Sequence, residues 1–342
     1  MKKITNSIAC LLLLSSLQLV KAQTAYKSIN KIKLEGDGGW DFLSADESAA
    51  RLYVSHSSKV QVVDLKTGNL VGTIPDTKGV HGITIAQDLN KGFISNGKDS
   101  SVTVFDITTL ATLAKVQVTG KKPDAILYDK FSHKVFVFNA GSNNATVLDA
   151  KTNAIVASIA FEGNPEVAVS DEKGKVYVNI ESTATVDVIN ASTLKTEASW
   201  KLDKGEEPTG LALDIKHQRL FSVCANKLMV ILDAANGKVI TSLPIGEGVD
   251  GVAFDAEKER AYSSNGGDGT ITVVEGKKGD NYKVLETITT QKGAKTIAID
   301  TKRRHIYTPT AEIVPAPEAT PENPKPRPSI KPGSFFVFDI QL

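Results

Sequence analysis

The sequence has 342 residues, with 40 Lys and Arg against 39 Asp and Glu, which gives a formal net charge of +1. Charges of both signs are mixed along the chain, so there is no bulk electrostatic attraction to nucleic acid or to an anionic membrane. A chain of this length accommodates two ordinary domains or one large repeat array.

The N-terminus has the pattern of a secretory signal peptide. Lys2 and Lys3 precede an apolar run of 13 residues (8–20), and Val20-Lys21-Ala22 offers a small-residue cleavage site. We therefore expect residues 1–22 to be removed and the mature protein, residues 23–342, to be periplasmic or secreted. The run is too short to span a bilayer as a helix, and no later stretch is long and apolar enough to do so.

Cleavage would change both the charge and the cysteine content. It would remove three lysines and no acids, so the mature charge would be +1 − 3 = −2. Cys224 would be the one cysteine left, without a partner for an internal disulfide. The stability of the mature protein would therefore come from its core even in an oxidising compartment.

The remaining chain is a repeat of short apolar runs. In residues 208–243 four such runs, LALD, RLFSV, LMVILD and KVITSL, are separated by turn-forming residues, which is typical of four antiparallel strands. Seven related units can be aligned on the polar residue that ends the third strand: Asp64, Asp106, Asp149, Asn190, Asp233, Glu275 and Asp339. Successive intervals are 42, 43, 41, 43, 42 and 64 residues. This period predicts an all-β, seven-bladed β-propeller with four-stranded antiparallel blades.

Two details of the repeat carry further expectations. The polar residue that ends each third strand should accept backbone N–H groups of the following turn.

The chain ends three residues after Asp339, which leaves blade seven without a fourth strand, whereas residues 26–34 form an unassigned strand before blade one. We expect this N-terminal strand to pair in the last blade and to close the ring.

The second strands carry a resemblance to a known family. They read Tyr53-Val-Ser-His56, Phe93-Ile-Ser-Asn96, Phe136-Val-Phe-Asn139, Tyr177-Val-Asn-Ile180, Phe221-Ser-Val-Cys224, Tyr262-Ser-Ser-Asn265 and Tyr307-Thr-Pro-Thr310. This pattern resembles the YVTN-type β-propeller repeat, and the mature chain is similar to YncE-like secreted proteins. The resemblance covers all seven units and implies the fold, but it assigns no chemistry to any residue here.

Candidate site residues come from the expected start of each first strand, at the mouth of the central channel. Counting back from the aromatic residue of each second strand places seven residues there: Asp41, His81, Asp124, Glu166, Thr209, Asp250 and Lys295. Blades one to four thus contribute Asp, His, Asp and Glu in succession, and two or three such groups that converge could hold a hard cation or zinc or supply a general base. Alternatively, the Asp side chains cap the turns that enter the strands. Trp40, beside Asp41, either walls a ligand site or packs between blades.

A proline-rich insert, residues 309–333, contains eight of the 13 prolines and lies in the second-to-third-strand loop of blade seven. Its composition favours polyproline II and argues against helix or ladder strand. We expect the insert to be partly ordered against the mouth, with Ile313, Val314 and Ile330 as apolar anchors and positive charge from Lys325, Arg327 and Lys331. A disordered surface loop is the alternative.

These features predict a secreted or periplasmic, monomeric binding or scaffold propeller without catalytic activity. Its partner would be a protein, a glycan or a small molecule bound at the mouth, with a divalent cation as a possible cofactor. Predicted ligand-binding residues are Trp40, Asp41, His81, Asp124, Glu166, Asp250 and Lys295. One alternative is a metal-assisted hydrolase or lyase that uses the mouth acids and resembles the lactonase-type propellers. Another is an accessory subunit of a redox or metal-handling system.

Overall fold

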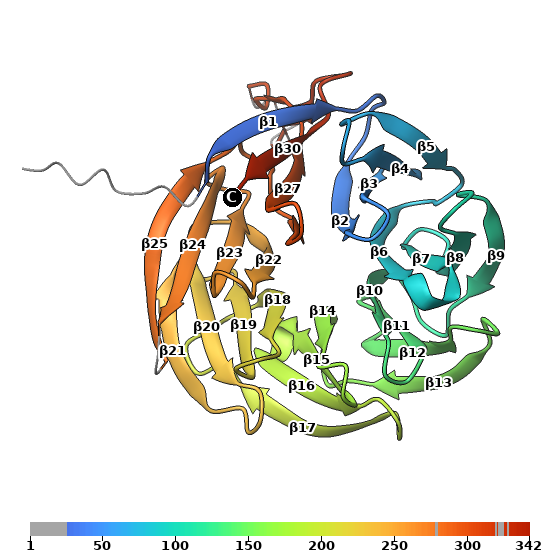
Figure 1. Ribbon diagram of the computed structural model, residues 1–342, viewed down its shortest axis with the longest axis vertical. Coiled ribbons are helices and arrows are strands. Elements are labelled where there is room, and N and C mark those ends of the chain that lie inside the picture. Colours follow the sequence, from blue (N-terminus) through green and yellow to red (C-terminus); the bar gives the residue numbers. More distant parts are fainter. Residues whose placement is uncertain (1–25, 278–279, 319, 321–324, 327) are drawn as a thin grey trace, which may run out of the picture.

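The computed structural model describes residues 26–277, 280–318, 320, 325–326 and 328–342; the expected signal peptide, residues 1–22, lies outside them. Seven four-stranded antiparallel sheets are arranged in a ring (Figure 1). The chain is therefore a seven-bladed β-propeller, as the 42-residue period predicts. In the described part of the chain no helix has the length and hydropathy needed to cross a membrane.

Blades one to six each use four consecutive strands. Blades one and two comprise β2 (Trp40–Asp46), β3 (Arg51–His56), β4 (Lys59–Asp64), β5 (Leu70–Ile74), β6 (Val80–Ala86), β7 (Lys91–Asn96), β8 (Ser101–Asp106) and β9 (Thr112–Gln117). Blades three and four comprise β10 (Pro123–Asp129), β11 (Lys134–Asn139), β12 (Asn144–Asp149), β13 (Ile155–Ala160), β14 (Pro165–Ser170), β15 (Lys175–Ile180), β16 (Thr185–Asn190) and β17 (Lys195–Lys201). Blades five and six comprise β18 (Pro208–Asp214), β19 (Arg219–Cys224), β20 (Leu228–Asp233), β21 (Val239–Pro244), β22 (Val249–Asp255), β23 (Arg260–Asn265), β24 (Thr270–Lys277) and β25 (Asn281–Thr289). Two single 3₁₀ turns, η1 (Gln87–Leu89) and η2 (Glu181–Thr183), lie in loops.

Blade seven combines the two ends of the chain. Its strands are β26 (Ala298–Asp300), β27 (His305–Thr310), β30 (Phe336–Gln341) and the N-terminal β1 (Ser28–Lys33). β1 pairs antiparallel with β30, with Ser28 opposite Gln341 and Lys33 opposite Phe336. The N-terminal strand is thus the outer strand of the last blade, and it covers an edge of β30 that would otherwise be unpaired.

The core lies between neighbouring blades. The aromatic residue of every second strand is at most 3% exposed: Tyr53, Phe93, Phe136, Tyr177, Phe221, Tyr262 and Tyr307. Tyr53 of blade one packs with Ile94 and Phe105 of blade two, and Tyr307 of blade seven packs with Leu52 of blade one. Burial of each such side chain contributes about 1.5–3 kcal/mol, so the blades stabilise one another rather than folding as separate units.

The residue that ends the third strand has the expected role in five blades. The carboxylate of Asp64 accepts the backbone N–H groups of Lys66 and Thr67 at 2.8 and 2.9 Å. Asp106, Asp149, Asn190 and Asp233 accept backbone N–H groups in the same way. In blades six and seven the carboxylates of Glu275 and Asp339 contact Arg260 and His305; residues 278–279, in the turn after Glu275, lie outside the described part of the chain.

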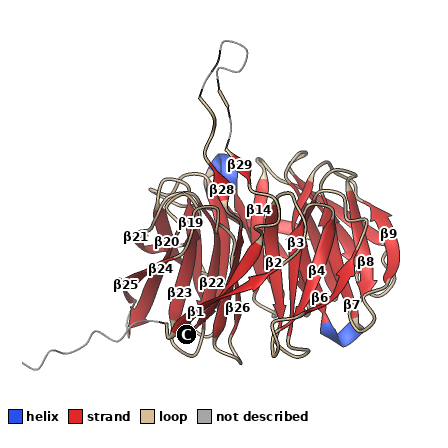
Figure 2. Cartoon of the chain, turned by 90° about the horizontal axis from the view of Figure 1, so that it is seen from above, coloured by secondary structure: helices blue, strands red, loops and turns tan. Residues whose placement is uncertain are grey.

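The proline-rich insert differs from its expected form. Figure 2 shows that it projects away from one face of the ring. It contains a short antiparallel ladder of β28 (Ile313–Val314) and β29 (Ser329–Ile330), so the expectation of no ladder strand is wrong. We call residues 311–335 the arm.

The arm is anchored at its base and does not dock over the mouth through its apolar residues. Ile330 packs on the core between blades one and seven, as expected of an anchor. Val314 is 44% exposed, and Ile313 is 42% exposed but lines a groove together with Gln291 and Lys292 of the ring. Lys331 pairs with Glu312 of the arm at 2.6 Å rather than with a mouth acid. Lys325 is exposed, and Arg327 lies outside the described residues. Hydrogen bonds to Ala311 and Gly333 hold the base to the ring.

Candidate functional site

A bulge at the start of each first strand positions the mouth residues. Asp41, His81, Asp124, Glu166, Thr209 and Asp250 are each the second residue of their strand. Directly after each of them the register with the second strand shifts by one residue, as between Trp40 and Leu43 or between Val80 and Ile83. A bulge re-aims the side chain that it carries. Lys295 occupies the same place in blade seven, three residues before β26.

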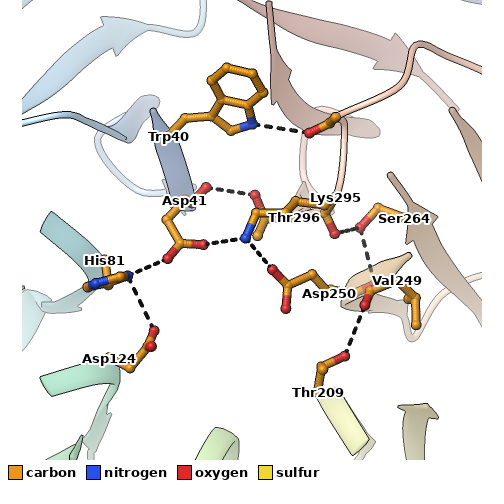
Figure 3. Close-up of polar contacts among 12 residues, drawn as sticks. Trp40, Asp41, His81, Asp124, Thr209, Val249, Asp250, Ser264, Lys295 and Thr296 are labelled. Carbon is orange, nitrogen blue, oxygen red and sulfur yellow. Dashed lines mark hydrogen bonds and ion pairs between the residues drawn. The ribbon is translucent and has the colours of Figure 1, made fainter. Parts of the chain in front are cut away.

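Five of the seven mouth residues form one continuous chain of contacts across five blades (Figure 3). His81 Nδ1 lies 2.5 Å from Asp41 Oδ2 and 3.5 Å from Asp124 Oδ1. Lys295 Nζ lies 3.3 Å from Asp41 Oδ1 and 2.5 Å from Asp250 Oδ2. The order Asp124, His81, Asp41, Lys295, Asp250 follows blades three, two, one, seven and six around the ring. We call these five residues the charge chain.

The positions of the side chains in the charge chain determine their protonation. Burial alone would raise the pKa of Asp41, but the hydrogen bond from His81 and the charge of Lys295 outweigh it and hold this pKa below its usual value. Burial would lower the pKa of His81, yet the Asp41 hydrogen bond and the Asp124 charge raise it overall. At the ends of the chain, burial raises the pKa of Asp124 to about 6, and it raises that of Asp250 despite the Lys295 charge. Asp41 is therefore the most firmly ionised of the three acids.

Glu166 and Thr209 lie outside the charge chain. Thr209 Oγ donates to the carbonyl of Val249 at 3.3 Å, which ties blade five to blade six. Glu166 is half-buried, and burial together with the charge of Asp124 raises its pKa to about 9. Of the four residues from blades one to four, three converge: Asp41, His81 and Asp124 have ligand atoms that all lie within 4.8 Å of one another.

The alternative expectation, that the mouth Asp residues cap turns, does not describe their side chains. In the described residues the carboxylates of Asp41, Asp124 and Asp250 contact only side chains from other blades. Backbone N–H groups are absent from their partners there. The mouth acids thus join blades to one another rather than stabilising their own strands.

A cavity of about 280 Å³ opens beside the charge chain, between blades one and two. Its lining includes Trp40, Asp41, His81 and the exposed Lys98. The indole N–H of Trp40 donates to the carbonyl of Gly293 at 3.1 Å, and its ring lies 5.6 Å from that of Phe335 at the base of the arm. Trp40 therefore packs between blades seven and one and also walls a cavity.

Three residues that the sequence reasoning missed hold the mouth in place. Each is the fifth residue of a second strand and donates to the carbonyl of the mouth residue in the next blade. Ser95 donates to Asp124, Asn179 donates to Thr209 at 3.0 Å, and Ser264 donates to Lys295 at 2.6 Å. Thr296 similarly donates to the carbonyl of Asp41 at 2.7 Å. The only sequence signal was a small polar residue before the last position of some second-strand motifs.

Comparisons with known proteins identify the fold. No protein-family model matches the chain, and no curated protein matches it by sequence. Solved structures do match: a chain of the Kuenenia stuttgartiensis hydrazine synthase superimposes with a TM-score of 0.71 at 16% identity, covering 80% of this chain and 94% of that chain. A chain of the mitotic checkpoint complex (TM-score 0.75, 10% identity, 100% and 99% covered) and U3-55K (0.76, 10%, 92% and 98%) are also similar. At these identities the likeness shows the propeller fold alone.

Proposed function

We propose that this chain is a secreted or periplasmic binding propeller, related to the YncE-like YVTN proteins, which engages its partner at the mouth face. The charge chain carries this proposal. Five half-buried charged groups from five different blades meet beside a cavity, on the face from which the arm projects. Binding sites combine such a hollow with a few fixed polar groups.

Binding without catalysis is favoured by the way the charges satisfy one another. Burial would lower the pKa of Lys295, but the charges of Asp250 and Asp41 outweigh it and raise this pKa. The ammonium therefore stays protonated at neutral pH and is a poor nucleophile. A group held between two carboxylates is suited to orienting a partner rather than to exchanging protons with it.

A protein partner is favoured over a glycan or a small molecule. One similar propeller chain belongs to a protein assembly, the mitotic checkpoint complex. The arm also extends the mouth face outward and presents Ile313 and Val314 to solvent. Exposed apolar side chains next to fixed charges are typical of a protein-recognition surface.

The proposal is tested by affinity purification from the periplasmic fraction of the producing cell. The variant Asp250→Asn with Lys295→Met removes one negative and one positive charge from the mouth, and we expect it to lose the partner that the wild type retains. The matched control is Glu257→Gln with Lys258→Met, which removes an exposed ion pair of 3.2 Å from a turn on the opposite face. Equal recovery with both variants would contradict the proposal. Mass spectrometry of the secreted protein should also show a chain that begins at Gln23.

The metal-assisted hydrolase or lyase is a second candidate function. The observation that favours it is the grouping of Asp41, His81 and Asp124, whose ligand atoms lie close enough to share one ion. A divalent ion there would polarise a substrate oxygen or activate water. This candidate function requires that the protein binds a divalent ion at these three residues.

A further inference from the structure

We propose that Asp41, His81 and Asp124 form a binding site for a zinc-type divalent transition metal ion at the mouth. This metal site goes beyond the binding function proposed above, since the ion could either contact a bound ligand or stabilise the fold. It rests on the geometry of the three ligand atoms, on the charge around them, and on the groups that orient them.

The three ligand atoms are of the kind that such an ion takes, and binding would replace the 2.5 Å hydrogen bond between His81 Nδ1 and Asp41 Oδ2 by bonds of about 2.0–2.2 Å from each atom to the ion. They are two carboxylate oxygens and one imidazole nitrogen, all within 4.8 Å of one another, from three consecutive first strands. Catalytic zinc sites hold the ion with three protein ligands and leave one position for water or substrate. The imidazole favours zinc and its neighbours over calcium and magnesium, which prefer oxygen ligands alone.

The residues around the site form a cluster in which carboxylates outnumber the ammonium group. His81 directs one nitrogen, Nδ1, toward both Asp41 and Asp124, at 2.5 and 3.5 Å. Three carboxylates, those of Asp41, Asp124 and Asp250, share one ammonium group, that of Lys295. Lys295 is held by Asp41 and Asp250, so it does not reach Asp124 in the described contacts. A dication in place of the His81 proton would offset this excess of carboxylates.

The groups around the ligands hold them in position for an ion. Lys295 occupies Oδ1 of Asp41 and leaves Oδ2 directed at His81. Thr296 and Ser95 fix the backbone carbonyls of Asp41 and Asp124, and Ser95 Oγ also accepts the backbone N–H of Gly82, next to His81, at 2.8 Å. Partners of this kind orient ligands and raise metal affinity. On the open side, Asp41 and His81 line the cavity beside Trp40, where further ligands have room.

Calorimetric titration of the chelator-treated protein with ZnCl₂ tests the site. We expect one zinc ion per chain, no binding of Ca²⁺ or Mg²⁺, and at least about tenfold weaker zinc binding in His81→Gln and in Asp124→Asn. Two controls should bind zinc like the wild type. Glu166→Gln changes a mouth acid outside the grouping, and His217→Gln removes a half-exposed histidine that lies 2.7 Å from Asp214 on the other face.

A second measurement keeps the test decisive if a variant folds poorly. X-ray absorption spectroscopy of the zinc-loaded wild type should show one imidazole nitrogen among oxygen ligands. Two or more imidazoles, a thiolate, equal binding in all four variants, or no saturable binding to the wild type would each overturn the metal site. None of these results would affect the partner test, because its variants change Asp250 and Lys295 rather than the three ligands.

Discussion

A single ammonium group connects the two halves of the charge chain. Lys295 lies between Asp41 and Asp250, and its side chain is 39% exposed while theirs are 14% and 22% exposed. The identity of these residues was predicted from the strand count, but their pairing was not. Which of seven mouth residues meet depends on the bulges and on distances between blades, and neither is encoded in the local pattern. The same reason explains why the sequence could not show that Glu166 lies outside the charge chain.

Replacing Lys295 by Met should destabilise the protein by about 1–3 kcal/mol. The full effect of breaking a buried ion pair is about 3–5 kcal/mol, and partial exposure of Lys295 reduces it. The cause is that two half-buried carboxylates lose their common partner. Chemical denaturation of the variant measures the change. Adding Asp250→Asn should restore part of the loss, and a single variant as stable as the wild type would contradict the pairing.

Glu166 should make the stability depend on pH. Burial raises its folded pKa to about 9 from an ordinary value of 4.5, so the folded protein keeps a proton that the unfolded chain releases between these pH values. The corresponding stability is fully present below about pH 4.5 and is lost as the pH rises to 9. We therefore expect Glu166→Gln to melt at increasingly higher temperature than the wild type as pH increases from 5 to 9. Thermal unfolding at several pH values checks this, and the exposed Glu206→Gln should not reproduce the trend.

Among the secondary-structure elements, regular strands were predictable and irregular ones were not. Alternating apolar residues and turn signals repeat every 42 residues or so, and they specify blades whose second and third strands are buried. The ladder in the arm was missed because it consists of two residue pairs, Ile313 with Ile330 and Val314 with Ser329, flanked by prolines. Such a short ladder is stabilised by its fixed base rather than by its own sequence.

Deletion of residues 23–35 should severely destabilise the propeller. The deletion removes β1 and exposes the edge of β30, and it takes Ile32 and Leu34, which are 9% and 4% exposed, out of the core. Each of these side chains contributes about 1.5–3 kcal/mol, against a typical net stability of about 5–15 kcal/mol. Thermal unfolding with light scattering should show a much lower melting temperature and aggregation. Val156→Asp, at a 48% exposed position of the outer strand β13, is the control and should melt like the wild type.

Replacing residues 313–329 by a short Gly-Ser linker should leave the fold intact, because Ile330, which packs on the core, is kept. Ile313 and Val314 are largely exposed, and the base contacts of Ala311 and Gly333 would be kept. We expect a melting temperature close to that of the wild type but weaker recovery of the partner in affinity purification. A clearly lower melting temperature of the linker variant would show that the arm contributes to the core. Unchanged recovery of the partner would show that the arm has no part in binding.

At the scale of the whole molecule, the ring follows from the repeat whereas the function does not. Propeller chains at 10–16% identity superimpose over 80–100% of this chain, because blade packing requires apolar alternation and turns rather than particular residues. The amino acids at the mouth can differ between propellers of the same fold, since their side chains contribute little to the hydrophobic core. The five-residue charge chain, rather than the fold, is therefore the basis on which we propose a function at that face.

Site-specific photo-crosslinking in the producing cell tests this placement most directly. A photoreactive amino acid would replace Lys98, which lines the cavity at the mouth, or Lys66, which is exposed in a turn on the opposite face. The account predicts a specific crosslinked adduct from position 98, none from position 66, and loss of the adduct when Asp250→Asn and Lys295→Met are added. An adduct formed from position 66 alone, or one from position 98 that survives the mouth substitutions, would contradict it.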